Sequence, residues 1–488
     1  MNQMNNIDME LSLNILQRYN NGLIGNEKPI TVKDLPTNNN ENIIQFDTEV
    51  KLSISQKDLL LFAAKFNIPL SIVEKFKSDP AIIDSESLEE IGIYLYPYFS
   101  FGILNGGSAT SYVDTTKNEQ FNSEIYTSNK TFINELKPIY SGKAKGITPA
   151  FINPDKSTGP SFMELKFRYL LLQSKEYRNR TMRDDKNLFP VFQMTSSTNN
   201  DEIMNHYKEL KNSYYLKDLL QNSSSNILNV ISGIQPLITA YTHSSKGTIK
   251  DFFKTSDTNY LPLPGGHGQC FYVLKSIFQE LYMKGIRFIS LGNVDNIGYN
   301  IDPKILSLLA LNNKDAMFEF SYKTEIDTKG GVLVLDDNNR LNCADLGVTI
   351  SKEEIKNAET SGKPILFNCA SGYFNLEILL SKIDFIIDNL PTRFSDQNKD
   401  IGIYSQAEQV TWEVISLLDN ISILAVNKYD RFLASKLLIE NLLTSGVINV
   451  SKNNNFYNKS LLLKDGLDEK LKTTYKLYLK NNRWESND

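Results

Sequence analysis

Residues 99–111 read FSFGILNGGSATS, an apolar run that ends directly in a pair of glycines. The apolar part, Phe99–Leu104, predicts a buried strand, and Gly106 and Gly107 predict a tight loop at its carboxyl end. Paired glycines let backbone N–H groups face one concavity, and they allow a phosphate or a base to approach closely. The loop matches neither G-x-G-x-x-G nor the P-loop pattern, which excludes those two motifs. An ordinary turn is the alternative interpretation.

From this stretch onward, short β-rich runs alternate with longer helical stretches, whereas the first hundred residues read as mostly helical. The alternation predicts an α/β layer fold with a largely parallel sheet. The predicted strands are Phe99–Leu104, Leu188–Met194, Ile227–Ile231, Phe288–Leu291, Met317–Tyr322, Gly331–Leu335 and Ile421–Val426, and the clearest predicted helices are Phe162–Glu176, Glu202–Leu210 and Phe271–Lys284. In such sheets ligands bind beyond the carboxyl ends of the strands, so we expect functional residues in the loops that follow strands.

The composition is that of a globular protein. The chain has 488 residues, 41% of them hydrophobic and 22% charged, which is long enough for about two or three domains with a sizeable core. Its net charge of −5 argues against wholesale binding of nucleic acid or of an anionic membrane. No apolar run approaches the roughly 18–20 residues of a membrane-spanning helix. We therefore expect neither nucleic acid nor a membrane as a partner.

The cysteines indicate a reducing compartment. Cys270, Cys343 and Cys369 form no C-x-x-C pair, which excludes a zinc ribbon and a disulfide framework. The first eleven residues lack a basic region followed by an apolar core, so the sequence predicts no secretory signal. A cytoplasmic location is the expectation.

Two further loops carry groups suited to phosphates. Lys145 precedes a glycine in KAKGITPA, residues 143–150, where a flexible lysine can lie over a polyphosphate. An ordinary surface lysine pair is the alternative. Residues 195–198 end a predicted strand with four hydroxyl side chains. These either bind a sugar or a phosphate, or they cap the helix predicted near Asp201.

The most distinctive run is LPGGHGQC, residues 263–270, in which glycines bracket His267. Flexible neighbours expose the imidazole and leave its ring nitrogens free to donate to an anion or a hydroxyl, which favours a functional role over a core position. The run N-V-D-N, residues 293–296, then places the carboxylate of Asp295 at the end of a predicted strand. That carboxylate suits sugar hydroxyls or Mg²⁺, which takes one or two carboxylates plus substrate phosphates. An Asx-type turn is the alternative.

Several reaction types lack their residues in this sequence. It contains no G-x-S-x-G elbow, no H-E-x-x-H helix and no cysteine beside a paired histidine, so the corresponding hydrolytic and thiol chemistries are excluded. It also contains no D-x-D metal motif, which argues against a glycosyltransferase of similar fold.

Taken in order from Phe101 to Lys436, these loops resemble the motifs of the eukaryotic-type UDP-sugar pyrophosphorylase family. Residues 104–111 resemble its L-N-G-G-L-G-T-S loop, residues 265–268 its P-P-G-H-G, and residues 293–296 its N-x-D-N. Further matches are K-G-G at 329–331, F-N-T-N at 367–368, Q-L-E at 406–408 and R-F-x-x-x-K at 431–436. The order of the motifs, more than any one of them, carries the resemblance.

The resemblance implies a Rossmann-like nucleotidyltransferase fold (GT-A-like), with a mixed sheet flanked by helices. It also implies transfer of UMP from UTP to a sugar 1-phosphate, with Mg²⁺ as cofactor. Glucose 1-phosphate is the first expectation, because the N-acetylglucosamine enzymes of the family usually have G-N-G in place of G-H-G. A UDP-N-acetylglucosamine pyrophosphorylase and a non-catalytic nucleotide-sugar-binding homologue are the alternatives. The oligomeric state is left open.

The resemblance also implies roles for single residues. Lys145, Lys436 and His267 are the implied catalytic residues. The implied substrate-binding residues are Gly106, Gly107, Gln235, Gly266, Asn293, Asp295, Lys329 and Asn368, and Asp295 is also the implied metal ligand.

We expect three regions: a helical N-terminal region at 1–95, the catalytic domain at 96–440 and a short C-terminal segment at 441–488. The chain departs from the family pattern at Ser108 and Ala109, at Gln269, and in an insertion that runs approximately from Tyr112 to Gly142. Roughly fifty residues follow Lys436. That length predicts that the C-terminal β-helix of the glucose-type enzymes is missing.

Overall fold

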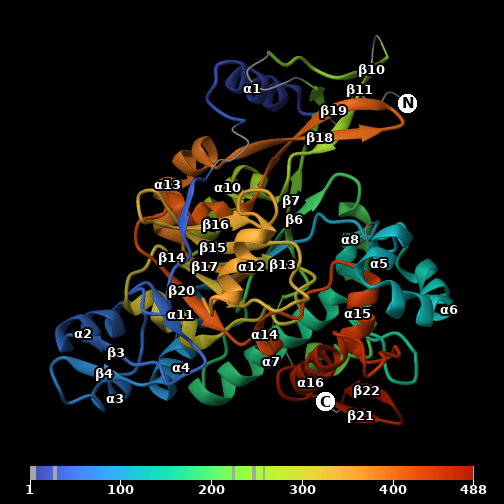
Figure 1. The fold of residues 1–488 in the computed structure, drawn as a ribbon. Coiled ribbons are helices and arrows are strands. Elements are labelled where there is room, and N and C mark those ends of the chain that lie inside the picture. The colour runs from blue at the N-terminus through green and yellow to red at the C-terminus, as the bar shows by residue number, and fades with distance from the viewer. Residues whose placement is uncertain are drawn as a thin grey trace.

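The computed structural model describes residues 7–25, 30–110, 112–221, 226–243, 249–256 and 259–486. Ser111, the last residue of the predicted glycine loop, lies outside them. Figure 1 shows a central sheet with helices around it, and the N-terminal helices α2 to α4 lie at the opposite side of the molecule from the C-terminal hairpin β21–β22. No described helix is long and apolar enough to cross a membrane.

The central sheet is mixed. Its main path runs β2 (Ile43–Gln45), β20 (Ile421–Val426), β14 (Ala316–Tyr322), β17 (Leu366–Asn375), β13 (Phe288–Asn293), β5 (Phe99–Leu104), β6 (Val191–Ser196) and β7 (Ile231–Gln235), and β15 (Gly331–Asp336), β16 (Leu341–Asp345) and β1 (Val32–Asp34) branch from it. All neighbours on the main path are parallel except where β17 pairs antiparallel with β13 and β14. The predicted α/β fold with a mixed sheet is confirmed.

The antiparallel strand β17 brings its own first residues to the edge where the parallel strands end. Asn368 pairs with Phe320 of β14, whereas Phe374, near the other end of β17, pairs with Ala316. Asn368 therefore lies near the start of β17, a strand that is absent from the predicted set. The polar run N-C-A-S-G inside β17 hides the strand, since Asn, Ser and Gly are depleted in strands.

Two of the predicted strands are displaced along the chain. β6 begins at Val191 rather than Leu188, after Phe189, whose φ is +55°, and Pro190, which has no N–H to donate. β7 begins at Ile231, where the predicted strand Ile227–Ile231 ends. Ile227 is buried as predicted, but it lies in a turn.

Helices cover both faces of the sheet. α7 (Phe162–Thr181) begins at a capping box in which Ser161 and Glu164 bind each other's backbone N–H groups. The other helices are α1 (Met9–Asn20), α2 (Gln56–Lys65), α3 (Leu70–Val73), α4 (Ser85–Tyr94), α5 (Thr115–Phe121), α6 (Ser123–Tyr140), α8 (Asn200–Glu209), α9 (Lys217–Gln221), α10 (Cys270–Met283), α11 (Pro303–Leu311), α12 (Lys352–Thr360), α13 (Leu376–Asn389), α14 (Lys428–Arg431), α15 (Leu438–Ser445) and α16 (Tyr457–Thr473). The predicted helices correspond to α7, α8 and α10.

Small sheets lie outside the central one. They pair β3 (Leu52–Ile54) with β4 (Ala81–Ile83), β8 (Leu237–Thr239) with β12 (Pro262–Pro264), β10 (Lys254–Ser256) with β11 (Asn259–Tyr260), and β21 (Leu477–Lys480) with β22 (Arg483–Ser486). A longer hairpin of β18 (Thr392–Lys399) and β19 (Gly402–Gln409) also pairs with β9 (Tyr241–Thr242). This hairpin extends toward α1 at the top of Figure 1.

One apolar core joins the beginning and the end of the chain. It contains Leu59 and Ile91 from the N-terminal region, and Leu467 and Trp484 from the C-terminal segment. Arg168 of α7 is buried beside it and donates its Nε–H to the carbonyl of Tyr475 at 2.6 Å. The C-terminal segment therefore packs into the body of the protein. The division into three regions stays a prediction.

Candidate active site

The glycine loop after β5 is held by neighbouring strand ends. The carbonyl of Gly106 accepts the side-chain amide of Asn199 at 3.0 Å, and the carbonyl of Gly107 accepts the backbone N–H of Lys145 at 3.0 Å. Ser108 and Ala144 form an antiparallel bridge. A Cβ atom at Gly107 would meet no heavy atom within 4 Å, so this part of the loop is open to a ligand. The contacts place the loop and Lys145 side by side.

Gln235 connects the end of β7 to the histidine loop. Its Nε2 donates to the carbonyl of Gly266 at 2.7 Å and to Oε1 of Gln269 at 2.8 Å. The same side chain reaches the glycine loop, because its Oε1 lies 3.6 Å from where a Cβ of Gly106 would be. Gln235 and Gly266 therefore lie together with Gly106 at one edge of the sheet.

Gly266 is required by the backbone. Its φ is +79°, and a Cβ there would lie 2.4 Å from the carbonyl oxygen of Gln409. A side chain at Gly268 would also collide with Gln409. The glycines around His267 therefore allow the loop to pack against the end of β19, and they do not leave the histidine flexible.

Thr411 holds His267 in place. Nδ1 of His267 accepts the backbone N–H of Thr411 at 3.2 Å and lies 2.7 Å from the threonine Oγ1, whose hydroxyl donates to the carbonyl of His267 at 2.9 Å. Since Nδ1 accepts, this network assigns the proton of the neutral ring to Nε2. One ring nitrogen is therefore available as a donor, where the sequence predicted two.

The imidazole is neutral near pH 7. Burial, together with the positive charge of Lys436, lowers the pKa of His267 to about 4, and Asp345 and Asp295 oppose this shift. Because these charges act on His267, Lys436 and Asp295 both lie within electrostatic reach of it. His267 is thus equipped to donate a hydrogen bond without carrying a charge.

A buried ion pair lies at the centre of the site. The ammonium of Lys145 contacts the carboxylate of Asp295, and only 13% and 11% of the two side chains are exposed. Lys145 Nζ also donates to the carbonyl of Ser435 at 2.6 Å and lies 5.3 Å from the ring centre of Tyr112. One lysine thus contacts the strand end that follows β13 and the segment that leads to Lys436.

Lys166, a residue that the sequence did not single out, holds the two segments that meet at Lys145. Nζ of Lys166 on α7 is buried and donates to the carbonyls of Asn296, at 2.5 Å, and Tyr299, at 2.7 Å. The amide of Asn296 in turn donates to the carbonyl of Arg431 at 2.9 Å and accepts the N–H of Leu433 at 3.0 Å. Burial holds the pKa of Lys166 well below its usual range.

The remaining predicted residues lie at the border of the site. Asn293 is the last residue of β13 and pairs with Leu104. Lys436 is exposed, and its Nζ donates to the carbonyl of Lys329 at 3.3 Å. The amide of Asn368 is engaged locally: Oδ1 accepts the N–H of Ala370 at 2.5 Å, and Nδ2 lies 3.4 Å from Cys343 Sγ. Within the described part of the chain, neither Asn368 nor the side chain of Lys329 forms a hydrogen bond or an ion pair with Lys145 or Asp295.

A second charged group beside the site was also missed. Arg393 of β18 contacts the carboxylates of Asp345 and Glu413. Burial and the charge of Asp345 raise the pKa of Glu408, which belongs to the predicted Q-A-E motif. Of these charged residues, Glu408 could be found from its sequence motif. Arg393 and Asp345 stand in stretches without a recognisable pattern, so the sequence does not single them out.

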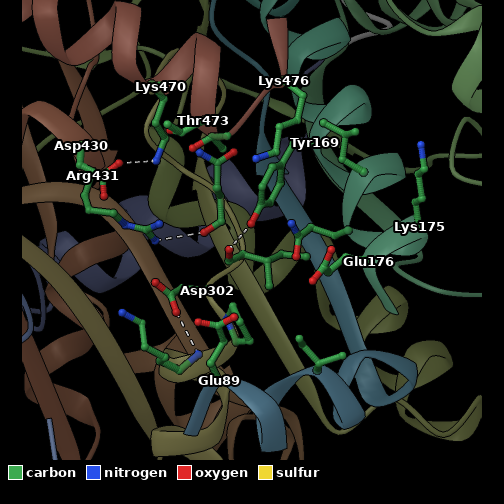
Figure 2. A pocket seen from close by; sticks show the side chains of 18 of the residues that line it. Glu89, Tyr169, Lys175, Glu176, Asp302, Asp430, Arg431, Lys470, Thr473 and Lys476 are labelled. Atoms are coloured by element: carbon green, nitrogen blue, oxygen red, sulfur yellow. Dashed lines mark hydrogen bonds and ion pairs between the residues drawn. The ribbon is translucent and has the colours of Figure 1, made fainter. Parts of the chain in front are cut away.

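A separate cavity of 620 Å³ lies behind the R-F motif, and none of the predicted site residues lines it. In Figure 2, Lys470 points to Asp430, and Arg431 points into the same space. Lys470 Nζ lies 2.7 Å from Asp430 Oδ1, while the buried Arg431 binds Glu319 and donates to the carbonyl of Asn300 at 3.0 Å. These paired charges fix Arg431 and with it the segment that carries Lys436.

Comparison of the sequence with known proteins finds relatives that are named as UTP–glucose-1-phosphate uridylyltransferases. The family model described as UTP–glucose-1-phosphate uridylyltransferase matches residues 170–476. UTP–glucose-1-phosphate uridylyltransferase 2 of Dictyostelium discoideum is 26% identical over 339 residues, which are 58% of this chain and 63% of that protein. The Encephalitozoon cuniculi uridylyltransferase is 30% identical over 124 residues, 25% of each chain. These matches span from 25% to 63% of the relatives' own length.

Solved structures share the fold. UDP-N-acetylglucosamine pyrophosphorylase of Trypanosoma brucei superposes with a TM-score of 0.57 at 16% identity, over 89% of this chain and 74% of that one. UDP-glucose phosphorylase of Trypanosoma brucei gives a TM-score of 0.51 at 18% identity, over 80% and 68% of the two chains. Because the family model matches residues 170–476, which are more than half of this chain, the chain belongs to the UTP–glucose-1-phosphate uridylyltransferase family.

Proposed function

We propose that the protein transfers UMP from UTP to a sugar 1-phosphate, giving a UDP-sugar and pyrophosphate. The observation that carries this proposal is the position of Lys145. Its ammonium contacts Asp295 and the carbonyl of Ser435, and its backbone N–H binds the glycine loop at Gly107. One cation thus stands where three loops meet at the carboxyl edge of the sheet, which is where this fold binds nucleotides.

The reaction requires cations more than a base. An oxygen of the sugar phosphate attacks the α-phosphorus of UTP in line, and the bond to the β-phosphate breaks to release pyrophosphate. The attacking oxygen is already anionic, so catalysis consists of bringing two anions together and stabilising charge on the transferring group. Lys145 and Lys436 supply positive charge. The backbone of Gly106 and Gly107, with Gln235 and Gly266, holds the uridine side.

His267 supplies a neutral hydrogen bond between the two phosphates. Nδ1 is occupied by Thr411, so the Nε2–H is the group that donates to a phosphate oxygen. Because the ring is neutral, this contact supplies a hydrogen bond and no charge. Asn293, Asp295, Lys329 and Asn368 form the sugar side of this proposal.

We also propose Mg²⁺ as the cofactor, with Asp295 as its protein ligand. The described residues contain no group of three or more His, Cys, Asp or Glu side chains that could hold a metal. The single carboxylate of Asp295 fits Mg²⁺, which commonly binds through one or two carboxylates together with substrate phosphates and water. When bound, it would neutralise phosphate charge. Asp295, which contacts Lys145, would hold the ion, and the ion would add to the positive charge available to the phosphates.

Glucose 1-phosphate is the proposed acceptor. The matched relatives are named for glucose, whereas the superposed structures include an N-acetylglucosamine enzyme. The test is pyrophosphate release from UTP and Mg²⁺ with glucose 1-phosphate, galactose 1-phosphate and N-acetylglucosamine 1-phosphate offered separately. Release with glucose 1-phosphate supports the proposal, and preferential release with N-acetylglucosamine 1-phosphate replaces it by the UDP-N-acetylglucosamine pyrophosphorylase alternative.

A non-catalytic nucleotide-sugar-binding protein is the other candidate, suggested by Ser108 and Ala109 in the glycine loop. Ala109 is buried in a small apolar cluster that includes Tyr112, so protein atoms cover its side chain. Binding of UDP-glucose without pyrophosphate release for any sugar would favour this candidate.

The buried free cysteines Cys270, Cys343 and Cys369 support the cytoplasm as the proposed compartment.

A further inference from the structure

A second cavity, of 540 Å³, borders the candidate active site at Lys436. We call it the lysine cavity. Its walls come from α5, the loop 326–329, the start of α12, the segment 432–437, α15 and α16. A volume of this size lies within the range of small-molecule sites.

The inner walls of the lysine cavity are apolar and aromatic. The rings of Phe121 and Phe456 lie 5.3 Å apart, and those of Phe367 and Phe432 lie 6.0 Å apart. Leu443 and Leu463 complete the apolar surface. A flat aromatic body would gain both burial and ring contacts here.

The entrance of the lysine cavity is positively charged. Lys117, Lys329, Lys352 and Lys436 line it, and all four are exposed. Both lining carboxylates are already engaged: Asp327 pairs with Lys428 at 2.6 Å, and Glu440 accepts the backbone N–H groups of Lys436 and Leu437. Among the described residues, Lys329 and Lys352 have no carboxylate partner. The net charge facing the opening is therefore positive, which suits an anion.

The lysine cavity meets the proposed active site at Lys329 and Lys436 and is otherwise separate from it. Phe367 lines it, whereas Asn368 is its neighbour on β17, and successive side chains of a strand point to opposite faces. Of the catalytic residues proposed above, Lys436 alone belongs to both places. An occupant of the cavity would thus compete with the reacting phosphates for this ammonium.

We propose that the lysine cavity binds an aromatic organic phosphate, and that this ligand inhibits transfer by drawing Lys436 toward itself. The apolar walls take the ring, and the entrance lysines take the phosphate. The inhibition rests on the proposed transferase function. The binding does not, since it is measured without turnover.

The binding test uses 1-naphthyl phosphate, whose fluorescence reports its own burial. We expect saturable binding to the full chain, and weaker binding of 1-naphthol, which lacks the phosphate. Lys352→Gln should weaken binding of 1-naphthyl phosphate about tenfold or more, because a charge-assisted hydrogen bond is lost. The matched control is Lys356→Gln, an exposed lysine one turn further along α12 that does not line the cavity.

Two further variants separate this cavity from the active site. Phe456→Ala removes part of an aromatic wall and should also weaken binding, with thermal melting to show that the variant folds. His267→Leu should leave binding unchanged, because His267 does not line the cavity. Equal affinity in Lys352→Gln and the unmodified protein, or loss of binding in a folded His267→Leu protein, would overturn the proposal.

The regulatory part is tested by initial rates of pyrophosphate release. 1-Naphthyl phosphate should inhibit the unmodified protein, and the concentration needed should rise at least tenfold in Lys352→Gln. Binding without inhibition in an active enzyme would overturn the link to Lys436. Absence of activity in every preparation would instead contradict the proposed function and leave the binding result standing.

Discussion

The imidazole of His267 and the hydroxyl and N–H of Thr411 form a closed hydrogen-bonded unit across 144 residues of sequence. Thr411 donates its N–H to Nδ1 and its hydroxyl to the carbonyl of His267. This unit fixes both the ring orientation and its tautomer. It turns a histidine in a glycine-rich loop into a rigid donor whose Nε2–H has a single direction.

Replacing His267 with leucine should reduce turnover on the order of 10²-fold, as expected for loss of one contact to the transferring group. Stability should fall much less, because the glycines of the loop pack on Gln409 without the ring. Initial rates and thermal melting of the same preparations provide the comparison. Parallel losses of rate and melting temperature would indicate that the histidine is structural.

The depressed pKa of His267 predicts a pH dependence of stability. In the folded protein this pKa is about 4, against 6.5 for the free side chain. Between these values the unfolded chain binds a proton that the folded one does not, so stability is fully present above pH 6.5 and falls as the pH drops toward 4. Denaturant unfolding at pH 7, 6 and 5 should show a shallower decline in His267→Leu. An equal loss of unfolding free energy with falling pH in the two proteins would contradict the low pKa of His267.

The Lys145–Asp295 pair predicts opposite behaviour of single and double variants. Lys145→Met leaves a buried carboxylate unpaired and should cost about 3–5 kcal/mol of unfolding free energy. Adding Asp295→Asn removes that charge and should recover much of the loss, while activity stays absent. Denaturant titrations measure the unfolding free energy of each variant, and pyrophosphate release measures its activity. Additive destabilisation in the double variant would show that the two groups are not coupled.

Lys436→Ala should abolish turnover and leave the fold intact. The side chain is exposed, and the one hydrogen bond its ammonium makes within the described residues is to the carbonyl of Lys329. Its loss therefore removes charge from the site without opening the core. The readouts are pyrophosphate release and the melting temperature. Full activity in this variant would refute the role given to the R-F-x-x-x-K segment.

Removal of divalent metal should stop turnover without unfolding the protein. Asp295 is the protein ligand proposed for the ion, and substrate phosphates and water supply the rest, so removal of the ion should leave the fold intact. We expect no pyrophosphate release in EDTA, recovery with added Mg²⁺, and an unchanged melting temperature throughout. A fall of several degrees in EDTA would reveal a structural metal instead.

The sequence predicted the elements that depend on local pattern. β5 begins at Phe99 and ends at Leu104, as its apolar run predicts. The loops that follow β5, β7 and β13 meet where a largely parallel sheet requires. The antiparallel β17 was missed because its polar residues are compatible with a strand only between β13 and β14, a condition that propensity does not describe.

The parts of the site that escaped prediction depend on partners far along the chain. The role of Thr411 depends on its hydrogen bonds with His267. That of Lys166 depends on its hydrogen bond to Asn296, 130 residues away. Neither stands in a motif. Helical periodicity places Lys166 on α7, but it cannot say that this lysine is buried with two carbonyl acceptors.

The hydrogen bond from Arg168 to the carbonyl of Tyr475 has a consequence for synthesis of the protein. α7 leaves the ribosome some three hundred residues before its acceptor does. Until then the guanidinium, which also donates to the carbonyl of Tyr215, lacks its acceptors at Tyr475 and Lys476, and the core around Leu467 and Trp484 is open. Lys145 likewise waits for Ser435. The nascent chain therefore completes the contact of Lys145 with Ser435, and the core around Leu467 and Trp484, only near the end of translation.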